Sequence, residues 1–88
     1  MRLDAGWMVR ADDRILEFLE EEGPHPPSKM ETDERIKFGA EYLGRRCREY
    51  LCPHGLVKNL GNGVYAITED GVSYLDGELD VSQIMPQE

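Results

Sequence analysis

The segment that most constrains the fold is GLVKNLGNGVYAIT, residues 55–68. Two runs rich in β-branched and other apolar residues flank Gly61-Asn62-Gly63, and Asn-Gly between such runs is a strong signal for a tight β-hairpin. Upstream of this segment the apolar residues recur at helical spacing instead. The chain therefore predicts an α+β, mostly helical fold in which one hairpin follows several helices.

The first two helices are predicted from their apolar spacing and their caps. An apolar stripe crosses residues 12–22, with Asp12 as the expected N-cap, and a Gly-Pro pair ends this helix. The next helix is short, residues 29–35, because Ser28 and Glu31 have the spacing of a capping box. A tight, glycine-containing turn follows it.

Two further helices lie on either side of the hairpin. One covers residues 40–52, where Leu43 and Cys47 belong to one apolar face. The other covers residues 69–80, with Thr68 as its N-cap. A first helix, two helices joined by a short turn, a β-ribbon and a last helix form the layout of a winged helix-turn-helix.

The chain is predicted to form one small domain. We expect an N-terminal arm over residues 1–11, the winged helix-turn-helix over residues 12–80 and a flexible C-terminal tail over residues 81–88. Because a single core is only marginally sufficient at this size, we also expect a homodimer, with a contact made by the arm around Trp7, the first helix or the last helix. No run has the length of a membrane span and no signal pattern begins the chain, so a cytoplasmic protein is expected, with no membrane partner.

Charge is distributed very unevenly along this acidic chain. The formal net charge is −8, yet residues 35–58 carry six basic and two acidic side chains, a local balance of +4. Because the local field governs what a surface attracts, this positive band favours an anionic partner, and double-stranded DNA is the partner we expect. Abundant Asp and Glu with only three lysines also resembles the composition of proteins from extreme halophiles.

Side chains of the predicted third helix are the main candidates for DNA contact. A helix of this kind can enter the major groove with its N-terminal half against base edges. We expect Arg45 to make a bidentate contact with a guanine, Tyr42 to touch a thymine methyl group or a phosphate, and Glu41 to accept from cytosine N4. Arg48 is expected to contact a phosphate, with a weak exposed ion pair as its structural alternative.

Arg46 is a further candidate on the same helix, but it lies nearer the edge of the apolar stripe. It could contact DNA. It could instead pair with Tyr42, with Glu49 or with the acidic first helix. The residues alone leave both interpretations open.

Three candidates lie outside the third helix. Lys37, at the turn before it, would hold the DNA backbone, and Lys58 in the wing would meet a phosphate. Asn62 at the wing tip would form a hydrogen bond in or beside the minor groove. Asn-Gly is also favoured at hairpin turns for backbone reasons alone, so Asn62 has a purely structural alternative.

Other classes of function have little support in the sequence. Cys47 and Cys52 point to roughly opposite sides of a helix, so no intrachain disulfide is expected, and Cys52-Pro53-His54 has no second ligand pair at metal-binding spacing. There is no glycine-rich phosphate loop and no nucleophile–base set, so we expect no enzyme activity, metal, cofactor or small-molecule ligand. The alternative to DNA binding is a winged-helix module for protein interaction, which the acidic flanks favour.

Four stretches carry a resemblance: the early GWM, DDRILEFLEEEG, YLGRRCREYLCPHGLV and GNGVYAITEDGVSYLDGELD, which together cover roughly residues 6–80. They resemble haloarchaeal phage-repressor-like winged helix proteins. The most specific part is the wing followed by YAITEDGVSYLDGELD. The resemblance implies a DNA-binding transcriptional regulator that acts as a homodimer, and it agrees with the halophilic composition.

Overall fold

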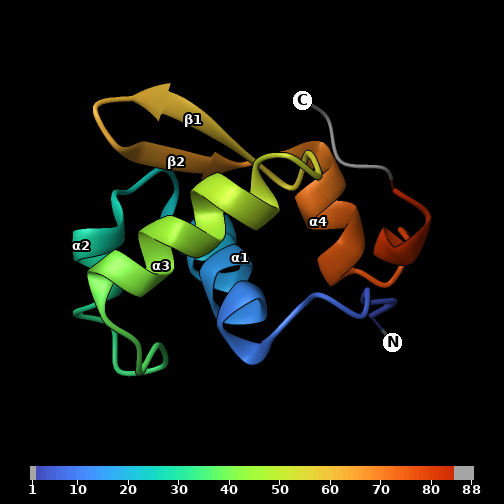
Figure 1. The fold of residues 1–88 in the computed structure, drawn as a ribbon, viewed down its shortest axis with the longest axis horizontal. Coiled ribbons are helices and arrows are strands. Elements are labelled where there is room, and N and C mark those ends of the chain that lie inside the picture. Colours follow the sequence, from blue (N-terminus) through green and yellow to red (C-terminus); the bar gives the residue numbers. More distant parts are fainter. Residues whose placement is uncertain (1, 85–88) are drawn as a thin grey trace.

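The computed structural model describes residues 2–84, and its elements follow the predicted order. They are α1 (Arg10–Glu22), α2 (Pro27–Met30), α3 (Ala40–Arg46), a π-helical turn (Cys47–Leu51), β1 (Val57–Gly61), β2 (Val64–Ile67), α4 (Glu69–Leu75) and a 3-10 turn (Val81–Gln83). In Figure 1, α3 crosses α1, the hairpin lies along one side of both, and α2 and α4 lie at opposite ends of the molecule.

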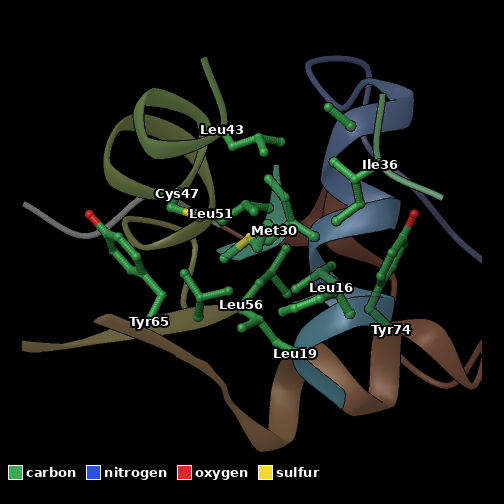
Figure 2. Close-up of a cluster of buried hydrophobic side chains, with 14 of the residues drawn as sticks. Leu16, Leu19, Met30, Ile36, Leu43, Cys47, Leu51, Leu56, Tyr65 and Tyr74 are labelled. Carbon is green, nitrogen blue, oxygen red and sulfur yellow. The ribbon is translucent and has the colours of Figure 1, made fainter. Parts of the chain in front are cut away.

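One hydrophobic core lies between α1, α3 and the base of the hairpin (Figure 2). Its fully buried aliphatic and sulfur-containing side chains are Ala11, Ile15, Leu16, Leu19, Met30, Leu43, Cys47, Leu51, Leu56, Val57 and Val81. The apolar stripes predicted for the first and third helices are therefore confirmed. The π-helical turn keeps Leu51 on the same face as Leu43 and Cys47, because its wider winding reverses the drift of an ordinary α-helix.

Two predicted N-terminal caps are wrong. α1 begins at Arg10, inside the predicted arm, and its N-cap is Val9, whose N–H donates to Asp12 Oδ2 at 3.1 Å. Asp12 therefore lies in the first turn and bonds back to the chain before it. In the second helix, Ser28 is not the cap, because α2 starts at Pro27.

α2 is also shorter than predicted and ends at Met30. Local hydrogen bonds replace helical ones beyond that point: Thr32 Oγ1 donates to the Lys29 carbonyl at 2.7 Å, and Arg35 N–H donates to Asp33 Oδ1 at 2.8 Å. Short polar side chains offer the backbone this alternative to a helix. The connection from α2 to α3 is therefore a long, side-chain-braced turn, and buried Ile36 anchors it to the core.

The predicted hairpin is confirmed. Asn62 and Gly63 both have positive φ, 55° and 76°, as a two-residue turn between twisted antiparallel strands requires. Within β2, Tyr65 also exchanges two backbone hydrogen bonds with His25, each 3.1 Å long, so the chain between α1 and α2 pairs with the hairpin at a third, isolated position. The wing is thereby attached to the helix-turn-helix.

α4 joins the last part of the fold to α1. Thr68 caps α4 as predicted, accepting from Gly71 N–H at 3.1 Å, although the helix ends at Leu75 rather than at residue 80. Tyr74 is 1% exposed, and its hydroxyl donates to Asp13 Oδ1 at 2.6 Å. This buried tyrosine, which was not predicted as a core residue, fixes α4 against α1.

The two ends of the described chain lie beside each other, near α4 (Figure 1). Leu3 forms a parallel bridge with Asp80, and Val81 N–H donates to the Leu3 carbonyl at 2.9 Å. Val81 is fully buried, so packed structure continues past residue 80, where a flexible tail was predicted to begin. Residues 85–88 of that predicted tail lie outside the described residues.

Candidate nucleic-acid interface

The solvent-facing side of α3 and of the π-helical turn that continues it presents four of the eight predicted DNA-contact residues. Glu41, Arg45 and Arg48 are exposed, while Tyr42 is half-buried with its ring 5.5 Å from that of Phe38. The packed side of α3 explains why these residues face outward, because Leu43 and its neighbours turn toward α1. The predicted base-reading set therefore shares one accessible helix face.

Arg45 is the least constrained arginine on this face. No carboxylate of residues 2–84 lies within ion-pair distance of its guanidinium. Arg48 has only a loose contact with its neighbour Glu49, at 3.6 Å between side chains that are 67% and 52% exposed. An exposed pair of this kind is worth less than about 1 kcal/mol, so it leaves Arg48 available to another anion.

Arg46 is not available, and its prediction as a DNA-contact residue is wrong. It is 7% exposed, with Nε donating to Asp12 Oδ1 at 2.9 Å and Nη2 donating to Asp12 Oδ2 at 2.6 Å. Nη2 also donates to the Trp7 carbonyl at 3.1 Å, and the guanidinium lies 3.8 Å from the centre of the Tyr50 ring. The hydrogen bonds to Asp12 raise the pKa of Arg46. The alternative interpretation, pairing with the first helix, is confirmed.

This buried pair sets the orientation of the candidate recognition helix. A bidentate arginine–carboxylate contact fixes both distance and angle between the two elements that carry it. The N-terminal arm adds a second constraint, because the Trp7 ring stacks on His54 at 4.2 Å and on Tyr50 at 5.9 Å. Trp7 thus anchors the N-terminal arm by packing, and His54 Nδ1 approaches the Tyr50 carbonyl to 2.6 Å at the helix end.

The preceding turn supplies one further free cation. Lys37 is exposed and forms no ion pair with the described residues, whereas Arg35 is held by Asp33 at 2.8 Å and by Glu21. α2 packs closely on α3, where a Cβ at Gly44 would lie 3.5 Å from Pro27 Cγ. Lys37 lies in the connection between the two helices, three residues before α3 begins.

The wing protrudes from the body of the protein. Lys58 and Asn62 are exposed, and four successive residues of β1, from 58 to 61, have both faces of the strand open to solvent. Lys58 has no carboxylate partner in the part of the chain that the structure describes. Residues 50–68 contain no aspartate or glutamate, although the whole chain has 18 acidic residues. The wing is thus free of the negative charge that covers most of the molecule.

Neither a disulfide nor a metal-binding cluster occurs among residues 2–84. Burial raises the pKa of the Cys47 thiol to about 12, so this cysteine stays protonated in the core, as predicted, and both cysteines are free. Across residues 2–84, the structure brings together no cluster of three or more His, Cys, Asp or Glu side chains suited to a metal ion. Within the same residues, no helix combines the length and hydrophobicity needed to cross a bilayer.

A short helix, a turn and a second helix, followed by a β-hairpin, define the winged helix-turn-helix class. The chain belongs to the winged helix-turn-helix phage repressor family, whose model matches residues 1–86. The chain is 41% identical in sequence to the PhiH1 repressor-like protein from Haloarcula marismortui. The crystal structure of that protein matches this fold with a TM-score of 0.91, over 98% of this chain and 97% of that chain. No match is found among curated proteins.

The predicted family and fold class are therefore confirmed. Membership in a repressor-like winged helix family suggests a DNA-binding regulator, in a group that is not typically enzymatic. The relative from Haloarcula also fits the halophilic composition.

Proposed function

We propose that this protein is a sequence-specific, repressor-like transcriptional regulator that binds double-stranded DNA as a homodimer. α3 would enter the major groove, and the wing would lie on the backbone or in the minor groove. The observation that carries the proposal is the contrast between two adjacent arginines: Arg46 is buried and fixes the helix, while Arg45 projects from it with no carboxylate partner among residues 2–84. Such a helix presents a free guanidinium in a fixed orientation.

In this arrangement the exposed residues divide into base readers and backbone contacts. Arg45 would bind guanine O6 and N7, and Glu41 and Tyr42 would contact neighbouring bases from the N-terminal half of α3. Arg48, Lys37 and Lys58 would contact phosphates, and Asn62 would reach the minor groove. Arg46 takes no part in DNA contact.

A homodimer would place two copies of α3 in successive major grooves, about 34–36 Å apart on a palindromic operator. Such a regulator would act in the cytoplasm, where the chromosomal DNA of a prokaryotic cell lies. Dimerisation would also double the number of base contacts.

Charge reversal at Arg45 is the direct test. We expect Arg45→Glu to weaken binding to the selected operator at least about tenfold, because one bidentate guanine contact is worth about 1–3 kcal/mol and the new carboxylate repels the duplex. The operator would be selected from a random DNA pool, and binding measured by fluorescence anisotropy.

Arg10→Glu is the matched control, since Arg10 is exposed, is in α1 and undergoes the same charge change. It should bind nearly as wild type does. If Arg45→Glu and Arg10→Glu have equal, small effects, the alternative of a protein-interaction module is favoured, because its acidic flanks rather than α3 would carry function.

Operator binding is also expected to fall less steeply with salt than that of a strongly basic DNA-binding protein. Each phosphate contact contributes about −0.9 to the slope of log K against log salt, and only three exposed cations, Lys37, Arg48 and Lys58, are candidates in each protomer. The slope should therefore be no steeper than about −3 per protomer in a titration from moderate to molar KCl. A much steeper loss would mean that nonspecific charge attraction, not base reading, holds the complex.

A further inference from the structure

The wing carries a large apolar side chain that the fold does not use. Leu60 is 52% exposed, more than Leu3 at 43% or Val9 at 42%, the other large hydrophobic residues exposed in the described chain. It lies in β1, close to the turn at Asn62-Gly63. A single exposed leucine needs no explanation by itself, but the backbone around this one is built in a particular way.

Leu60 is the extra residue of a β-bulge. Asn59 pairs with Tyr65 and Gly61 pairs with Val64, so the register passes over Leu60, which has no residue opposite it. The bulge is braced by Asn59, whose Oδ1 accepts from Gly61 N–H at 2.8 Å. Gly61 has φ 101°, a conformation that side chains disfavour. Bulges of this kind redirect a side chain away from the regular strand.

The surroundings of Leu60 indicate an anionic partner. Lys58 lies two residues before it on the same strand and has no ion pair with the described residues, and no acidic residue occurs from residue 50 to residue 68. Glu69 and Asp70 line the same hollow as Lys58, at the start of α4, but they belong to α4 and not to the wing itself. A self-association surface or a protein partner would not require the absence of carboxylates. A DNA groove does, because phosphates border it on both sides.

We propose that Leu60 inserts into the minor groove and packs on sugars and base edges, so that the wing binds DNA by an apolar contact rather than by a cation at its tip. The inference rests on the proposed function. Apolar side chains do enter the minor groove in other architectures. In molar salt such a contact persists, because salt screens phosphate attraction but does not weaken apolar burial.

The test compares Leu60→Ala with Lys58→Ala over a range of KCl concentrations, using the selected operator. We expect Leu60→Ala to lower operator affinity about tenfold. The factor should be the same at moderate and at molar salt, since the change removes apolar contact area and no charge. Lys58→Ala should instead make the slope of log K against log salt shallower by about 0.9, and it should have little effect on affinity in molar salt. Leu60→Met, which keeps the apolar volume, should bind as wild type does.

A second readout locates the contact. Hydroxyl radicals cleave the deoxyribose from the minor-groove side, so Leu60→Ala should lose protection at the wing's footprint while the α3 contacts remain. If Leu60→Ala binds the operator within twofold of wild type, the inference about Leu60 is overturned but the proposed function is not. Changed sedimentation of Leu60→Ala without DNA would overturn it in favour of a contact between two copies of the chain. Absence of operator binding by the wild type would overturn the proposed function itself.

Discussion

Asp12→Ala is expected to lower the free energy of unfolding by about 3–5 kcal/mol, because it leaves the buried guanidinium of Arg46 without its counter-charge. The Asp12 side chain is 0% exposed and that of Arg46 is 8% exposed, so water cannot replace the lost carboxylate. The mutation also removes the acceptor for Val9 N–H at the start of α1. Domains of this size are stable by about 5–15 kcal/mol in total, so the loss is a large fraction of the whole.

Thermal and urea unfolding in high salt would measure this loss. For a domain below 100 residues, each kcal/mol corresponds to a change in Tm of about 4–8 °C, so a fall of roughly 15 °C or more is expected. Glu20→Ala, at an exposed position of the same helix, is the control and should change stability by less than about 0.5 kcal/mol.

The double variant Asp12→Leu/Arg46→Met should recover much of the stability, because no unpaired charge then remains in the core. The operator affinity of the double variant tests whether the ion pair orients α3. If the ion pair orients α3, the double variant should fold yet bind DNA less tightly than wild type. A cost below about 1 kcal/mol for Asp12→Ala would show that the pair is solvated and does not hold the helix.

Gly71→Ala is expected to be the most damaging change at any glycine of the described fold. A Cβ at this position would lie 2.4 Å from the Leu56 carbonyl oxygen and 2.5 Å from Ile67 Cγ1. Neither neighbour can yield easily, because the Leu56 carbonyl accepts from Thr68 N–H at 3.1 Å and therefore holds the end of the hairpin to the start of α4. Overpacking of a core typically costs 1–3 kcal/mol, and a clash with backbone places this variant at or above about 3 kcal/mol.

Gly44→Ala is the matched control in α3. Its Cβ would lie at an ordinary contact distance, 3.5 Å from Pro27 Cγ, and alanine is about 1 kcal/mol better than glycine inside a helix. We therefore expect Gly44→Ala to be neutral or slightly stabilising and Gly71→Ala to be strongly destabilising, by circular dichroism at increasing urea. Similar midpoints for both variants would contradict the close approach of α4 to the hairpin.

Features with local causes were predicted well from the sequence. The hairpin follows from Asn62-Gly63, which reaches positive φ at little steric cost, and the cap of α4 follows from Thr68, whose hydroxyl lies close to its own helix. The apolar stripes of α1 and α3 follow from the helical period. In each case the residues that decide the outcome are within a few positions of one another.

Neighbouring residues do not decide the roles of the three clustered arginines. Arg45, Arg46 and Arg48 have the same chemistry, and helical spacing alone places Arg46 only near the edge of the apolar face. What separates them is Asp12, which is 34 positions away and reaches Arg46 because α1 packs against α3. The predicted N-cap role of Asp12 was wrong for the same reason, since its carboxylate is occupied by this distant partner and by Val9.

By itself, therefore, the sequence determined the order of the elements, the wing, the apolar faces and the positive band. These features depend on backbone preferences, periodicity and charge among neighbouring residues. Only the tertiary structure decided which arginine is buried and which is free, how tightly Gly71 meets the hairpin, and that Leu60 stands out on a bulge. The first two properties depend on contacts between different segments of the chain, where burial makes a charge pair or a close approach decisive. The bulge depends on the register in which the two strands of the hairpin pair.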